Sequence, residues 1–133
     1  MHLIQMTYSS RPFGFDAPTL SAILLDARRA NLRDDISGAL IARADIYLQL
    51  LEGPETMVNA AYERIVRDNR HLEVKPLYSR PVAARMFGGW AMRDDPVRSW
   101  MWSLEEVANG AAERATSTQV QAVFARLASE PAH

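Results

Sequence analysis

Gln49 is the residue whose type fits its surroundings least, because it interrupts the apolar run Tyr47-Leu48-Gln49-Leu50-Leu51. Such a run predicts a buried strand, and a buried amide costs roughly 1–3 kcal/mol unless its donor and acceptor groups are paired. Gln49 is therefore either a structural amide with polar partners inside the fold or a contact to a bound heteroaromatic ligand. Its oxygen only accepts and its nitrogen only donates, so rotating the amide exchanges one hydrogen-bond pattern for another, as a switch requires.

Four other residues have side chains that could contact such a ligand or take part in such a switch. Each of them has an ordinary structural role as an alternative. Tyr8 ends the first predicted strand, either as a core tyrosine or as a donor of an electron and a proton to an excited ring. Asn31 ends the first predicted helix, either as a cap or turn residue or as a carboxamide that matches a uracil-like edge. Trp90 and Met92 share one face of a predicted last strand, either as packing residues or as part of the site.

A charged cluster follows the second predicted helix and consists of Arg64, Arg67, Asp68, Arg70 and His71. Most clusters of this kind are solvated surface charge, whereas a phosphate-bearing partner would give the arginines charge-assisted hydrogen bonds. The sequence contains no HExxH, GxGxxG, Walker or GxSxG motif. A nucleotide bound by this chain would therefore not be held by a Rossmann turn or a P-loop.

The composition is that of a single globular domain. The chain has 133 residues, of which 48% are hydrophobic and 23% are charged, and its formal net charge is −1. Acidic and basic residues are mixed along the chain, which argues against direct nucleic-acid binding, and no apolar run approaches the ~20 residues of a membrane helix. The absence of cysteine excludes disulfides and covalent thiol chemistry. Since no secretory signal is visible at the N-terminus, we expect a cytoplasmic protein.

Hydrophobic periodicity and helix caps predict a ferredoxin-like α+β fold. Asp16 can cap a first helix, which ends before a polar connector from Asn31 to Asp35. The predicted strands are residues 3–8, 36–42, 46–51, 74–78 and 90–92, and the second helix is residues 55–67. The order βαββαβ plus a final strand predicts a mixed sheet with two helices on one face.

The predicted strand at residues 46–51 is apolar on both sides, so both faces of the sheet must be covered. Two helices cover one face. The tail is also predicted to be helical, with capping boxes that start at Ser103 and Thr116 and an apolar stripe of Val120, Val123, Phe124 and Leu127. Either this tail or a second subunit covers the other face. We expect self-association into a homo-oligomer, because aliphatic surface left exposed loses about 25 cal/mol of hydrophobic free energy per Å².

Taken in order, these residues resemble the BLUF family of blue-light sensors that use flavin. The likeness runs over about residues 2–95. It is carried by Tyr8-Ser9-Ser10, by Asn31 before Ile36-Ser37-Gly38, by Leu48-Gln49-Leu50-Leu51-Glu52-Gly53, by Asp68-Asn69-Arg70-His71, and by Arg85-Met86-Phe87-Gly88-Gly89-Trp90-Ala91-Met92. One departure is Ala91, which replaces a common serine and removes a hydroxyl between Trp90 and Met92.

The resemblance implies a role for each candidate residue. The family binds FAD, or sometimes FMN, noncovalently between the two helices of a ferredoxin-like fold. The implied roles are photochemistry for Tyr8 and Gln49, flavin binding for these two with Asn31, Asp68, Arg70 and His71, and signal relay for Trp90 and Met92. Residues 1–97 would form the sensor domain and residues 98–133 a C-terminal helical extension, as in the short, stand-alone type.

We therefore expect a blue-light photoreceptor that is not an enzyme. Light would draw an electron and then a proton from Tyr8, and Gln49 would rotate or tautomerise, which would shift the flavin absorption slightly to the red. The output would be self-association or contact with an unidentified protein partner, with no direct nucleic-acid or membrane contact. Two alternatives remain open. One is a flavin or small-ligand binding module that never switches, and the other is an acylphosphatase-like hydrolase with an arginine–asparagine pair.

Overall fold

The fold is built on one mixed five-stranded sheet. In the computed structural model, which describes residues 3–132, the strands are β1 (Leu3–Pro12), β2 (Ser37–Arg43), β3 (Ile46–Pro54), β4 (His71–Val82) and β5 (Arg93–Pro96). Their order is β4-β1-β3-β2-β5. All neighbouring strands are antiparallel except β2 and β5, which run parallel.

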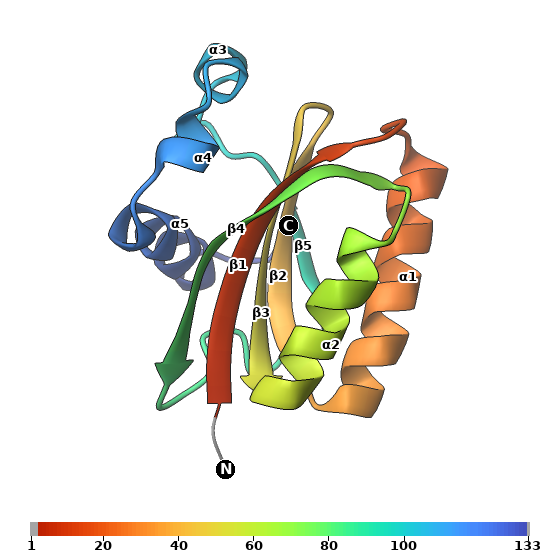
Figure 1. The fold of residues 1–133 in the computed structure, drawn as a ribbon. Helices are drawn as coiled ribbons and strands as arrows, with labels where there is room; N and C mark the ends of the chain where they lie inside the picture. The colour runs from red at the N-terminus through yellow and green to blue at the C-terminus, as the bar shows by residue number, and fades with distance from the viewer. Residues whose placement is uncertain (1–2, 133) are drawn as a thin grey trace.

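Helices cover both faces of this sheet. α1 (Ala17–Asp34) and α2 (Glu55–Val66) lie side by side on one face, and α3 (Leu104–Ala108), α4 (Ala111–Arg114) and α5 (Ser117–Ser129) lie on the other side (Figure 1). The element order confirms the predicted ferredoxin-like α+β fold. None of the helices within residues 3–132 combines the length and the apolar character that crossing a membrane requires.

α1 begins where the sequence predicts but ends later. Asp16 is its N-cap and accepts a hydrogen bond from the Thr19 N–H at 2.7 Å. The predicted connector from Asn31 to Asp35 is wrong, because the helix continues to Asp34 and stops where Asp35 takes a left-handed conformation with φ 59°. No glycine or proline lies in this stretch to break the helix earlier, and aspartate tolerates the left-handed conformation better than most residues. Asn31 therefore lies in the last turns of a helix.

The strands differ from the predictions in length and, for the last one, in position. β1 and β4 are longer than predicted, and the ladder between them contains two register shifts. The predicted strand at residues 90–92 is wrong, because β5 begins only at Arg93, where it pairs with Ala39 of β2. Alternating large side chains favour a strand locally, but a ladder forms only where a neighbouring strand offers its backbone groups.

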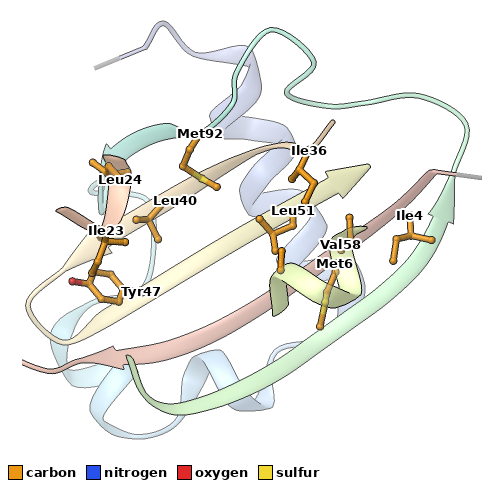
Figure 2. Packing of buried hydrophobic residues seen from close by; sticks show 12 residues of the cluster. Ile4, Met6, Ile23, Leu24, Ile36, Leu40, Tyr47, Leu51, Val58 and Met92 are labelled. Atoms are coloured by element: carbon orange, nitrogen blue, oxygen red, sulfur yellow. The ribbon is translucent and has the colours of Figure 1, made fainter. Parts of the chain in front are cut away.

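One core lies between the sheet and the helices α1 and α2. Tyr47 and Leu51 of β3 point to this side of the sheet, as the alternation predicts. Figure 2 shows how side chains from the strands and both helices meet there. The labelled residues are Ile4, Met6, Ile23, Leu24, Ile36, Leu40, Tyr47, Leu51, Val58 and Met92.

A second core lies between the opposite face of the sheet and the tail. Leu48 and Leu50 of β3 pack there with Val120, Phe124 and Leu127 of α5. Both predicted capping boxes, at the starts of α3 and α5, are present. The prediction that the tail helices cover this face is confirmed. The apolar residues of β3 therefore need no second subunit to cover them.

Candidate functional site

A cavity of ≈ 200 Å³ opens between α1 and α2, over the sheet. Aliphatic side chains form much of its wall, namely Ile23, Ala27 and Ala30 of α1, Leu51 of β3, and Ala61 and Ile65 of α2. Its polar lining consists of Asp26, Asn31, Gln49, Arg64, Asp68, Arg70 and His71. Five of the eight residues to which the resemblance gives a role thus line one cavity, namely Asn31, Gln49, Asp68, Arg70 and His71.

Gln49 and Tyr8 face each other on neighbouring strands. They are direct partners in the ladder between β3 and β1, and the Tyr8 hydroxyl donates a hydrogen bond to the Gln49 Oε1. Both side chains are buried. Burial, aided by the charge of Asp68, raises the pKa of the Tyr8 hydroxyl well above its ordinary value. The phenol is therefore protonated and is a hydrogen-bond donor in the resting protein.

The other end of the Gln49 amide contacts Met92. The Gln49 Nε2 donates to the Met92 Sδ at 3.3 Å. The expectation that Gln49 has polar partners inside the fold is confirmed, and the chain itself supplies two of them. A thioether is only a weak acceptor, so the bond to Met92 is the weaker of the two and the easier one to exchange.

Trp90 and Met92 do not share a face, and the prediction that they do is wrong. Met92 is 1% exposed, whereas Trp90 is 42% exposed and has the Arg93 guanidinium 6.0 Å from its ring centroid. The segment follows an irregular path because its carbonyls are held outside a ladder. The Trp90 carbonyl accepts from the Gly38 N–H at 3.1 Å, and the Ala91 carbonyl accepts from the Asn31 Nδ2 at 2.7 Å. The Met92 carbonyl accepts from the Arg28 Nη2 at 2.9 Å.

Asn31 closes the end of α1 with its backbone and lines the cavity with its side chain. Its backbone carbonyl accepts from the N–H groups of Asp35 and Ile36, and so closes the end of α1. Its buried side chain lines the cavity and donates through Nδ2 to the Ala91 carbonyl. An amide that donates through its nitrogen keeps its oxygen as an acceptor. The side chain can thus join a ligand in the cavity to the segment before β5.

Asp68, Arg70 and His71 follow α2 and form one side of the cavity. Arg70 donates to Asp68 at 2.7 Å and lies 3.1 Å from Asp26 of α1, so it bridges the two sides of the opening. The hydrogen bonds from Arg70 lower the pKa of Asp68. Burial lowers the pKa of His71 to about 4, and its Nδ1 lies 2.9 Å from the Ser10 Oγ. At neutral pH the cavity therefore has an uncharged imidazole in its wall.

Three residues that shape this region have no role assigned from the sequence, namely Arg28, Ser10 and Glu52. Arg28 holds Met92, and Ser10 holds His71. Glu52 is fully buried and accepts hydrogen bonds from the Ser37 hydroxyl at 2.9 Å, the Met86 N–H at 2.8 Å and the Phe87 N–H at 2.6 Å. An ionisable side chain at the end of the apolar run of β3 was a signal for Glu52. The other two contacts join residues about 60 positions apart and leave no local pattern.

The cavity has the chemistry that a flavin needs. Aliphatic residues on α1, α2 and β3 can contact a flat ring, and the amides of Asn31 and Gln49 offer donors and acceptors to a polar ring edge. Arg64 and Arg70 can donate charge-assisted hydrogen bonds to phosphate groups that extend from the ring. Within residues 3–132 no group of three or more histidine, aspartate or glutamate side chains is arranged to hold a metal ion.

Comparison with known proteins identifies a family. The model of the BLUF family, described as sensors of blue light using FAD, matches residues 3–93. The blue light- and temperature-regulated antirepressor BluF of Escherichia coli (strain K12) is 39% identical over 62 residues, which are 47% of this chain and 15% of that protein. The photoactivated adenylate cyclase subunit beta of Euglena gracilis is 37% identical over 68 residues, which are 51% of this chain and 8% of that protein. The chain thus spans a small part of these longer relatives.

Solved structures share the fold over nearly the whole chain. BlsA in its photo-activated state superposes with a TM-score of 0.84 at 20% identity and 98% coverage of both chains, a likeness of fold. BlrB, a BLUF protein in its dark state, superposes with a TM-score of 0.78 at 26% identity and 96% coverage of both chains. The family model matches most of this chain, and five of the eight residues with an expected role line one cavity. The chain therefore belongs to the BLUF family of blue-light sensors that use FAD.

Proposed function

We propose that residues 1–97 form a photosensor domain with a flavin in the cavity between α1 and α2, and that residues 98–133 form a helical extension that carries the output. One observation carries the proposal. The buried chain of contacts from the Tyr8 hydroxyl through the Gln49 amide to the Met92 sulfur meets the cavity at Gln49, which lines it. A phenol, a reversible amide and a weak acceptor are together the parts that a hydrogen-bond switch needs.

Binding follows from the polar groups of the cavity. The Asn31 carboxamide oxygen would accept from the imide N–H of the ring, and the neutral His71 imidazole would lie beside the ring. Arg70 and Arg64 would contact phosphate. FAD is the flavin we propose, because two arginines suit a pyrophosphate. FMN has the same ring with a single phosphate and is the alternative.

Tyr8 and Gln49 would carry the photochemistry. A bound flavin supplies absorption of blue light and, once excited, a strong electron acceptor. Tyr8 would pass an electron and then its phenolic proton to the flavin, which removes the hydrogen bond to the Gln49 Oε1. Gln49 would then be able to rotate or tautomerise. When Tyr8 regains its electron and proton, Gln49 would remain in a different set of hydrogen bonds, and the flavin absorption would move slightly to the red.

The altered amide would change its contact with Met92. After rotation the Gln49 oxygen, which cannot donate, would face the Met92 sulfur. Met92 would then favour another position, and it is joined directly to Arg93 at the start of β5. Light would thus stabilise one of two arrangements of this segment relative to the tail. We propose that the output is self-association or contact with another protein through surfaces that this change alters.

Two substitutions on the contact chain test the proposal, and one matched control accompanies them. Tyr8→Phe and Gln49→Leu should keep the bound flavin and its yellow colour but lose the light-induced red shift. Tyr78→Phe removes a hydroxyl that donates to Gln5 instead, so this variant should respond like the parent. A normal red shift in Tyr8→Phe would remove this residue from the mechanism. Bound flavin without a light response in the parent chain would identify a binding module that does not switch.

A further inference from the structure

Arg28 of α1 holds the backbone of Met92 with two donors. Its Nε lies 3.1 Å and its Nη2 2.9 Å from the Met92 carbonyl oxygen, and the same Nη2 lies 2.9 Å from the Asp94 Oδ1. The ladder of β5 begins only at Arg93. A planar guanidinium that reaches one carbonyl with two donors constrains its position closely.

The same methionine is held from the other side by the Gln49 amide. The Gln49 Nε2 lies 3.3 Å from the Met92 sulfur. Methionine has three rotatable bonds between its backbone and its methyl group, so its sulfur has a defined position only where the surroundings impose one. The neighbouring carbonyls of Trp90 and Ala91 have other donors. Arg28 thus contacts the backbone of the same residue whose sulfur accepts from Gln49.

We propose that Arg28 is a positioning residue of the photoswitch, acting through Met92 on the orientation of Gln49. The inference deepens the proposed function and rests on it. With the Met92 backbone held, its sulfur accepts from the Gln49 amide nitrogen, and the amide oxygen remains directed to the Tyr8 hydroxyl. Return of Gln49 to this orientation after illumination requires the sulfur to be in place. Asp94, the ion-pair partner of Arg28, orients the guanidinium.

A purely structural role for Arg28 makes a different prediction. If Arg28 only ties α1 to the edge of the sheet, its loss lowers the melting temperature and leaves the photocycle unchanged. If Arg28 positions Met92, its loss slows the return to the dark spectrum. The Met92 sulfur is then less ordered and accepts from the Gln49 amide less often. We expect recovery to slow about tenfold, which corresponds to about 1.4 kcal/mol in the activation free energy.

The experiment compares Arg28→Gln, Arg28→Lys and the control Arg29→Gln in the full chain with bound flavin. Arg29 is the next residue of α1 and is exposed. Recovery after a blue flash should be about tenfold slower in Arg28→Gln and unchanged in Arg29→Gln. It should be intermediate in Arg28→Lys, which keeps the charge but lacks the fixed pair of nitrogens that reaches the Met92 carbonyl.

A second readout in the dark does not depend on photochemistry. The chain has six methionines, and the carbon-13 methyl signal of Met92 can be assigned with Met92→Leu. We expect this signal to shift or broaden in Arg28→Gln and to stay unchanged in Arg29→Gln. A parent-like recovery together with an unchanged Met92 signal in Arg28→Gln would overturn the inference. Absence of any light-induced shift in the parent would instead refute the proposed function.

Discussion

Glu52→Gln tests the buried carboxyl group that anchors the segment between β4 and β5. Its Oε1 accepts the Met86 N–H at 2.8 Å, and its Oε2 accepts the Phe87 N–H at 2.6 Å and the Ser37 hydroxyl at 2.9 Å. The substitution turns one of these oxygens into an N–H₂ donor with nearly the same shape. Whichever oxygen is replaced, a backbone N–H then faces another donor and loses its partner.

Glu52→Gln should lower the free energy of unfolding through the loss of these contacts. Leaving one buried N–H without a partner costs about 1–3 kcal/mol, and the remaining bonds lose their charged acceptor. We therefore expect a loss of about 2–4 kcal/mol in the free energy of unfolding. At about 2.1 cal/mol/K of unfolding entropy per residue, this corresponds to a melting temperature about 7–14 °C lower for this chain.

Thermal unfolding followed by circular dichroism measures this loss, and Glu105→Gln is the matched control. Glu105 is exposed in α3, so its substitution should change stability by about 0.5 kcal/mol or less. Glu52→Gln should keep the light-induced red shift, because Tyr8 and Gln49 keep their contacts. Phe87, which meets Phe124 of α5 with ring centroids 6.3 Å apart, should become less ordered. A melting temperature within 2 °C of the parent would refute the reasoning, since the amide would then satisfy the same donors.

Three further outcomes follow from the structure. Because the pKa of His71 is lowered, the imidazole binds a proton less readily in the folded state than in the unfolded state. The free energy of unfolding should therefore be retained above pH 6.5 and fall between about pH 6.5 and 4. His71→Gln should reduce this fall relative to the parent in urea titrations at several pH values. Asp95→Asn leaves the buried Arg93 guanidinium without its carboxylate partner at 2.8 Å. The free energy of unfolding measured in urea should fall by about 3–5 kcal/mol. A fall of less than about 1 kcal/mol would contradict this. Trp90→Ala should change the recovery kinetics less than Met92→Ala, because only Met92 contacts Gln49; the reverse order would show that the exposed tryptophan carries the relay.

Much of the fold follows from patterns within short stretches of the chain. The Asp16 cap, the two capping boxes and the helical stripe of α5 all occur as the sequence predicts. The alternation along β3 places Gln49 on the face of Tyr47 and Leu51, with Leu48 and Leu50 on the other. Caps and periodicity are properties of neighbouring residues, so their consequences can be predicted without knowledge of distant contacts.

The candidate site could be predicted in its residue types but not in its arrangement. Tyr8 and Gln49 are recognisable from the sequence because a phenolic or polar side chain in an apolar setting needs partners, and Asn31 is recognisable as a carboxamide at the end of a predicted helix. Which partners they obtain depends on segments far away in the chain. Asn31 bonds to Ala91, 60 positions later, and Gln49 bonds to Met92, 43 positions later.

The sequence by itself determined the order of elements, the face on which each residue of β3 lies and the need for polar partners around Gln49. Only the tertiary structure decided that Met92 turns inward and Trp90 outward, and that β5 begins after both. The reason is that a strand requires a neighbour with matching backbone groups. The carbonyls of Ala91 and Met92 instead accept from side chains of α1, Asn31 and Arg28, whose positions are set by the packing of the whole domain.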